Sequence, residues 1–131
     1  MTNIERAELA RSLKASGKCN CAQAVVSALY DLTDLELKQL LDLTSGFAVG
    51  MGNMEATCGA LIGANIVLSN IIKNGTIRYS KILHDKFKEK TKGTICKIIK
   101  GKDTGVILTE CDMCCYNAVI SFFEVMELIQ G

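Results

Sequence analysis

The chain has 131 residues, of which 49% are hydrophobic and 22% are charged, and its formal net charge is +1. This is the ordinary balance of a soluble protein, and the length allows one core without help from disulfides. The longest apolar stretch, Ala60 to Ile72, is too short for a membrane span, which needs about 20 residues. Met1 to Arg6 lacks the basic and apolar pattern of a secretion signal. We therefore expect a cytoplasmic protein that does not enter a membrane.

The N-terminal part predicts three helices. Apolar residues recur at helical spacing up to Gly17, then from Cys21 to Leu32, and again after Thr33. Glycine at position 17 favours the end of the first helix. Two capping-box patterns predict where the first and third helices begin, namely Thr2 with Glu5 and Thr33 with Glu36.

A glycine-rich segment follows, in which Gly46, Gly50 and Gly52 are spaced too irregularly for a regular helix. It matches neither the dinucleotide-binding nor the P-loop pattern. We expect a loop whose backbone N–H groups lie next to a cysteine and can bind or tune a cofactor there.

The fourth predicted helix begins near Cys58 and ends around Lys73 to Gly75, where glycine favours a left-handed cap. Its small residues recur at helical spacing and let another backbone approach closely, either within the chain or across a homodimer. These residues are Gly59, Ala60, Gly63 and Ala64.

Three further helices are predicted in the C-terminal part. A basic helix runs from Thr76 to about Lys92, Thr94 caps a short helix, and the last helix runs from about Asp112 to Ile129. Between them, the segment Thr104 to Thr109 is compatible with an extended backbone. The fold class is therefore all-α: a compact single-domain bundle of about six to seven helices over residues 1–131, with a glycine-rich loop.

Cysteine is the most informative residue type, because seven cysteines form an odd number and lie near predicted helix ends. They are Cys19, Cys21, Cys58, Cys96, Cys111, Cys114 and Cys115. Helix starts present free N–H groups and a positive dipole end, which stabilise a thiolate for nucleophilic attack or for metal binding. Four of these thiols (Cys21, Cys58, Cys96 and Cys115) lie in the first turn of a predicted helix. We expect them to converge on one site.

The sequence Cys111-Asp112-Met113-Cys114 is a Cys-x-x-Cys motif. We do not expect a thioredoxin-like fold, because the β-α-β pattern that surrounds the motif in that fold is missing. A structural zinc site would need a second such pair or nearby histidines. Thiolates without histidine suit an iron–sulfur cluster, zinc or copper(I).

Charge is unevenly distributed, since the segment from Lys73 to Lys102 contains ten Lys and Arg residues but only Asp85 and Glu89 as acids. A solvated helix face explains most such segments, and no nucleic-acid motif accompanies this one. It also supports an alternative function, a non-enzymatic helical binding module that docks an acidic partner.

The order of glycine and cysteine motifs resembles the redox-active family named C_GCAxxG_C_C. The resemblance covers most of the chain and lies in Asn20 to Val25, Ser45 to Phe47, Gly50 to Gly52, Thr57 to Ala64, Cys96 and the cysteine that opens the last helix. At its centre the chain reads Cys58-Gly59-Ala60 where the family name has Gly-Cys-Ala.

The resemblance implies a helical protein that is redox-active or binds an iron–sulfur cluster. It maps the family cysteines to Cys21, Cys58, Cys96 and one of the C-terminal group. Cys115 is chosen because Val119 follows it by one helical turn, with Cys111 and Cys114 as alternates.

Two mechanisms are open for this site. In one, these cysteines hold a cluster or another metal, and the loop of Gly46, Gly50 and Gly52 tunes its potential. In the other, no cofactor is bound, and Cys58 and Cys21 are redox thiols of a reversible disulfide. The chain would be a thiol oxidoreductase or an electron carrier with an unknown redox partner.

Overall fold

The computed structural model describes residues 1–130, and in this part of the chain it contains helices and no strands. The all-α prediction is confirmed. The α-helices are α1 (Asn3–Ala15), α2 (Cys21–Leu29), α3 (Leu37–Thr44), α4 (Gly59–Ile72), α5 (Thr76–Thr91), α6 (Cys96–Lys100) and α7 (Cys111–Gln130). Two shorter helical turns are η1 (Tyr30–Leu32) and η2 (Gly50–Met54).

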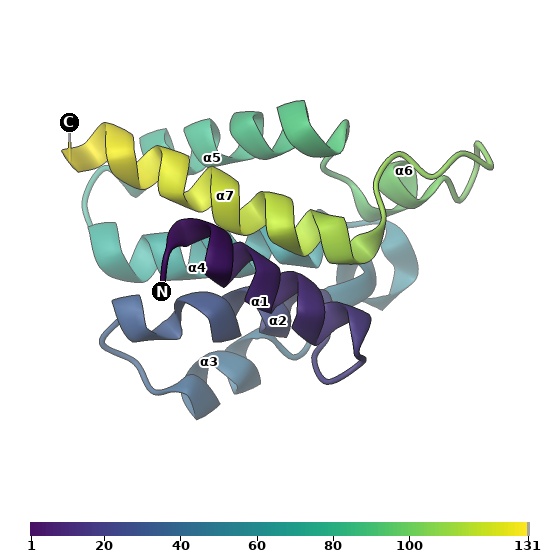
Figure 1. Ribbon diagram of the computed structural model, residues 1–131. Helices are drawn as coiled ribbons and strands as arrows, with labels where there is room; N and C mark the ends of the chain where they lie inside the picture. Colours follow the sequence, from purple (N-terminus) through teal and green to yellow (C-terminus); the bar gives the residue numbers. More distant parts are fainter. Residues whose placement is uncertain (131) are drawn as a thin grey trace.

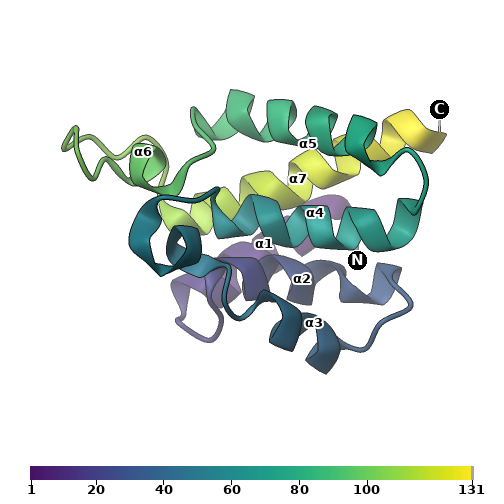
Figure 2. The ribbon, with the colours of Figure 1, turned by 180° about the vertical axis from the view of Figure 1, so that it is seen from behind.

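The long helices lie side by side along one common direction (Figures 1 and 2). Helix α7 contacts α1, α2, α4 and α5, while α2 packs between α1 and α4. Both termini lie at one end of this bundle, and α6 lies at the other end (Figure 1). Helices α2, α4 and α7 all begin at the α6 end. The topology therefore brings three helix starts, each carrying cysteine, to the same end.

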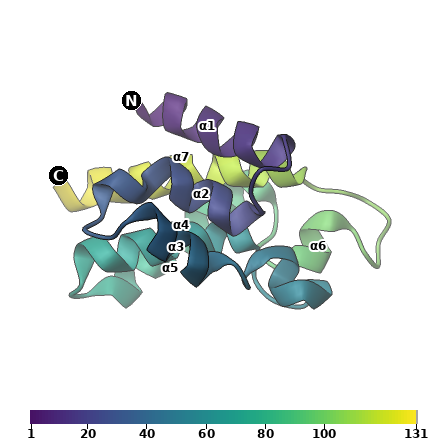
Figure 3. The ribbon, with the colours of Figure 1, turned by 90° about the horizontal axis from the view of Figure 1, so that it is seen from below.

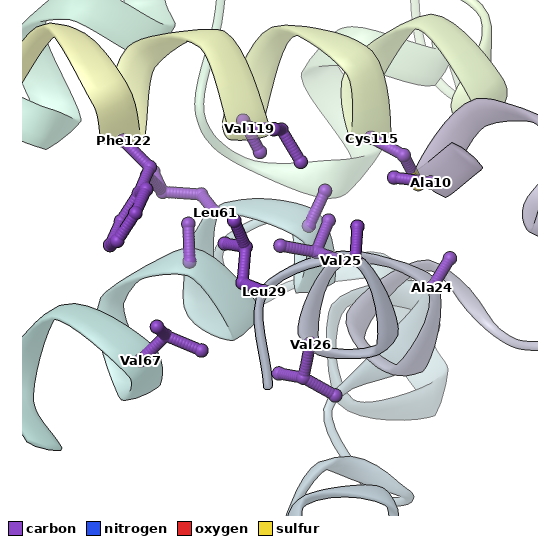
Figure 4. Packing of buried hydrophobic residues seen from close by; sticks show 14 of the residues in the cluster. Ala10, Ala24, Val25, Val26, Leu29, Leu61, Val67, Cys115, Val119 and Phe122 are labelled. Carbon is purple, nitrogen blue, oxygen red and sulfur yellow. The ribbon is translucent and has the colours of Figure 1, made fainter. Parts of the chain in front are cut away.

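The core lies between α2, α4 and α7, where aliphatic and aromatic side chains interdigitate (Figure 4). Leu29 of α2, Val67 of α4 and Phe122 of α7 are fully buried. Burying a side chain of this size stabilises the fold by about 1.5–3 kcal/mol. The helix starts at the α6 end are therefore held in position by a well-packed core.

Side-chain capping explains where several helices begin. The predicted capping box of Thr2 and Glu5 is confirmed, and Asn20 forms another with Gln23 at the start of α2. The predicted cap at Thr33 is wrong. Helix α3 begins later, with Glu36 as its cap, because the Thr33 hydroxyl donates to the Tyr30 carbonyl, 2.7 Å away, and closes η1.

Three other local predictions also need correction. The second helix ends as an α-helix at Leu29, before η1, and α6 is capped by Ile95 rather than Thr94. The segment 104–109 forms turns and bends instead of an extended strand. Its Leu108 amide donates to the Ile99 carbonyl, 2.8 Å away, so the segment folds back onto α6.

The small-residue face of α4 packs inside the chain. A Cβ atom added to Gly63 would lie 2.8 Å from the Ala22 carbonyl oxygen, so the backbones of α4 and α2 are in close contact. This face is therefore not free to form a dimer, and the homodimer stays a prediction without an assigned surface. Among residues 1–130, no helix is long and apolar enough to span a bilayer.

Candidate functional site: a cavity lined by thiols

Two backbone hydrogen bonds tie the start of α4 to the start of α6. The Cys58 amide donates to the Thr94 carbonyl at 2.7 Å, and the Cys96 amide donates to the Ala56 carbonyl at 3.0 Å. Together they form an isolated antiparallel bridge between Thr57 and Ile95. The turn η2 also contacts α6 at this end (Figure 3). Two cysteines far apart in the sequence therefore become neighbours.

The cysteines at this end surround a small cavity. It is lined by Cys21, Val49, Cys58, Gly59, Cys96, Ile99, Lys100, Cys111 and Cys114. The cavity volume is about 10 Å³. This is roughly the space that one water molecule requires. Five thiols from α2, α4, α6 and α7 thus line one enclosed space, as the sequence predicted for Cys21, Cys58 and Cys96.

Cys58 is the thiol whose surroundings most favour ionisation. It caps α4 and is only 6% exposed. The neighbouring Cys114 thiol is the largest cause that lowers the pKa of Cys58, to about 7. Burial opposes this effect, while the backbone amides of Ala60 and Leu61 and the charge of Lys100 reinforce it. Near neutral pH, a large fraction of Cys58 is therefore thiolate.

The neighbouring thiols are shifted in the opposite direction. The neighbouring Cys58 sulfur, followed by burial, raises the pKa of Cys114. Burial is the main cause that raises the pKa of Cys21, although the Val49 amide partly offsets it. Burial likewise raises the pKa of Cys96. The cavity therefore combines one ionisable thiol with neighbouring thiols that stay protonated.

Cys111 differs from the other cavity thiols because its side chain is partly exposed. The ammonium group of Lys100 contacts its sulfur. Burial alone would lower the pKa of Lys100, but the contact with Cys111 and the nearby sulfurs of Cys96 and Cys21 together raise it, so the group stays positively charged. A fixed cation therefore lies beside the most accessible sulfur at the cavity.

Cys115, which was predicted to complete the site, does not line the cavity. It is fully buried and donates through its thiol to the Cys21 carbonyl oxygen, 3.6 Å away. Figure 4 shows it beside Ala10 of α1. The structure places the two alternates, Cys111 and Cys114, at the cavity in its place. Cys19 lies outside the cavity near Ser27.

The glycine loop contributes to the site through one glycine. Gly50 is buried, and a Cβ atom added there would lie 2.8 Å from the Cys96 Cβ. Gly46 and Gly52 are exposed and have nothing within 4 Å of such a Cβ. The residue of this segment that lines the cavity is Val49, whose amide interacts with the Cys21 sulfur.

Sequence reasoning missed Lys100 and Val49. Lys100 follows Cys96 by four residues, a spacing that places two side chains on one helix face. That signal was present within the basic segment. For Val49, no local signal exists, because its position depends on how the loop folds back over α2.

A metal or cluster was tested against this arrangement. The donor type fits, because the cavity offers several thiols. The arrangement does not fit. The cavity has the volume of about one water molecule, and among residues 1–130 no three Cys, His, Asp or Glu side chains are grouped to hold an ion.

The basic segment is largely surface, and part of its charge is paired within the chain. Lys73 pairs with Asp34, Lys81 with Asp85, Lys90 with Glu124 and Lys97 with Glu55. Its use as a docking surface for an acidic partner stays a prediction.

The fold and the cavity define a class of protein: a small helical bundle with a group of buried thiols at one end. Residues 19–127 match the family described as "Putative redox-active protein (C_GCAxxG_C_C)". The chain belongs to this family, which confirms the resemblance seen in the sequence. No curated protein matches the chain. No solved structure matches it either.

Proposed function

We propose that this chain is a thiol–disulfide redox protein in which Cys58 and Cys114 alternate between a dithiol and a disulfide. The observation that carries the proposal is that both thiols line one cavity of about 10 Å³, where the pKa of Cys58 is lowered to about 7 and that of Cys114 is raised. In disulfide exchange a thiolate attacks a disulfide sulfur, so an ionised Cys58 can close a disulfide with its neighbour once the Cys114 sulfur is oxidised.

Oxidation removes two electrons from the reduced pair, together with the one proton that a Cys58 thiolate and a Cys114 thiol hold between them. An external disulfide accepts them and leaves as one thiol and one thiolate. In the bond-forming step, the Cys58 thiolate attacks the Cys114 sulfur after that sulfur has become part of another disulfide, and the second sulfur of that disulfide leaves as a thiolate. Cys58 suits this role, because its pKa of about 7 lies near ambient pH.

Cys21 and Cys96 support the pair in this proposal. Burial keeps both in the thiol form, so they do not add further negative charge next to Cys58. The predicted role of Cys21 as the second redox thiol stays open, because Cys21 also lines the cavity.

A thiolate-bound metal or cluster is the second candidate. It is favoured by the five thiols that line one cavity without a histidine. The small volume and the absence of a three-ligand group among residues 1–130 count against it.

The test is an anaerobic redox titration of the full chain in mixtures of reduced and oxidised dithiothreitol, with disulfides mapped by mass spectrometry. We expect one two-electron transition and a Cys58–Cys114 disulfide. It should be lost in Cys58→Ser and Cys114→Ser but kept in Cys19→Ser, a matched control outside the cavity. A disulfide between other cysteines, or none, would refute the pair. Stoichiometric iron with sulfide, or zinc, in the purified protein would favour the second candidate.

A further inference from the structure

We propose that Cys111 is the thiol that first reacts with the external disulfide and passes the oxidation inward to Cys114 and Cys58. This inference rests on the proposed function and assigns to Cys111 a catalytic role at the same site. Three independent features of the structure support it: accessibility, a neighbouring cation and position on the helix.

Accessibility separates Cys111 from the pair. Cys58 is 6% exposed and Cys114 is 2% exposed, whereas Cys111 is only partly buried. A thiolate must approach a disulfide along its S–S axis, with the leaving group on the far side, so the attacking sulfur needs open space. A cavity of about 10 Å³ does not supply that space at Cys58.

The cation beside Cys111 is Lys100, which reaches the sulfur from α6. A thiol that exchanges disulfides becomes an anion each time it leaves, and an ammonium group stabilises that anion by direct contact. Neither Cys58 nor Cys114 has a lysine contact of this kind. The positive charge of Lys100 therefore lies beside Cys111, the partly exposed thiol.

Helix geometry connects Cys111 with the pair. Cys111 and Cys114 lie three residues apart in the first turn of α7, a spacing that places both on one face. Both line the cavity, as Cys58 does. The three sulfurs thus form a series from the surface to the interior.

The reaction then balances in three exchanges. The Cys111 thiolate attacks a disulfide R–S–S–R′, binds the R sulfur and releases R′S⁻. The Cys58 thiolate takes the proton of Cys114, the resulting Cys114 thiolate attacks the Cys111 sulfur, and RS⁻ leaves. Cys58 then gives this proton to RS⁻ and attacks the Cys114 sulfur, and Cys111 leaves as a thiolate beside Lys100. Two electrons have moved from the Cys58–Cys114 dithiol to the external disulfide.

The decisive experiment uses 4,4′-dithiodipyridine as the disulfide and the reduced full chain. In Cys114→Ser, we expect the mixed disulfide to accumulate on Cys111, as located by peptide mapping. Acid quenching of the unmodified protein at early times gives the same information without a substitution at a buried site. A label found on Cys58 while Cys111 stays free would overturn the proposal.

Reaction rates distinguish a failure of the role of Cys111 from a failure of the proposed Cys58–Cys114 pair. Cys111→Ser should slow the release of the first pyridine thiol at least ten-fold and still form the Cys58–Cys114 disulfide in the end. An unchanged rate would refute the role of Cys111 and leave the pair intact. Failure of the unmodified protein to form the Cys58–Cys114 disulfide would refute the proposed function itself.

Lys100 is a positioning residue in this scheme. Lys100→Gln should slow the first exchange several-fold, and Lys100→Arg should restore it because the positive charge is kept. Lys97→Gln is the matched control, since Lys97 lies on the same helix and pairs with Glu55 at 3.2 Å instead of with a thiol. Equal effects of Lys97→Gln and Lys100→Gln would contradict a specific role for the Lys100 contact.

Discussion

The backbone N–H of Cys58 donates a 2.7 Å hydrogen bond to the carbonyl oxygen of Thr94. This bond connects Cys58, the residue just before α4, to the segment just before α6. Because a short helix of five residues is not stable alone, the position of Cys96 and Lys100 depends on such tertiary bonds. The thiol cavity is therefore a product of the connection between helices, and not of any one helix.

The reactivity of Cys58 should depend on pH in a defined direction. Its pKa is lowered to about 7, so the thiolate and its alkylation rate decrease as the pH falls through 7. In Cys114→Ala, the largest cause of the lowering is lost, and the inflection should move to higher pH. Iodoacetamide labelling with peptide mapping across the pH range measures both curves. An inflection that stays in place would show that Cys114 does not control Cys58.

Cys115 should behave as a core residue. Burial raises its pKa, and its thiol is held against the Cys21 carbonyl. Cys115→Ala should lower the free energy of unfolding by about 1–2 kcal/mol through lost packing and one weak hydrogen bond. The Cys58–Cys114 disulfide should still form with an unchanged midpoint in the dithiothreitol titration. Loss of that disulfide would restore Cys115 as a site residue.

Gly63→Ala should destabilise the protein although it raises helix propensity. Alanine is favoured over glycine within a helix by about 1 kcal/mol. The added Cβ would meet the Ala22 carbonyl oxygen at 2.8 Å, and overpacking of a core typically costs about 1–3 kcal/mol. Urea unfolding followed by circular dichroism measures the balance. Gly46→Ala is the control, since nothing lies within 4 Å there; a stabilised Gly63→Ala would disprove the close contact of α4 with α2.

Stability should also decrease in acid through the ion pair of Arg6 and Asp31. The Arg6 guanidinium is largely buried, donates to both Asp31 oxygens and lowers the pKa of that carboxyl. A carboxyl whose pKa is lowered on folding adds its full stability at pH values above 3.8, the pKa of the unfolded chain. This stability is lost as the pH falls through the lower pKa of the folded protein. Because Asp31 is half exposed, Asp31→Asn should cost only about 1 kcal/mol at neutral pH. Its stability should also vary less between pH 6 and pH 2, which denaturant unfolding at several pH values tests.

Some features of this protein are determined locally and were predictable. Apolar spacing and capping boxes act within a few residues, so the helices that begin at Thr2 and Asn20 follow from sequence alone. The placement of Cys21 and Cys58 at helix starts follows for the same reason. Thr33 was misassigned because its hydroxyl bonds to Tyr30 and Leu35, both before α3, and Glu36 caps that helix instead.

Other features were decided only by tertiary structure. One residue along an α-helix turns the side chain by about 100°. Cys114 therefore lines the cavity, whereas Cys115 is buried and hydrogen-bonded to the Cys21 carbonyl, and the sequence by itself could not distinguish them. The lowered pKa of Cys58 likewise depends on a neighbouring thiol from another helix, Cys114. The sequence by itself determined which residue types stand at the helix starts, and the packing of α2, α4, α6 and α7 decided which sulfurs meet.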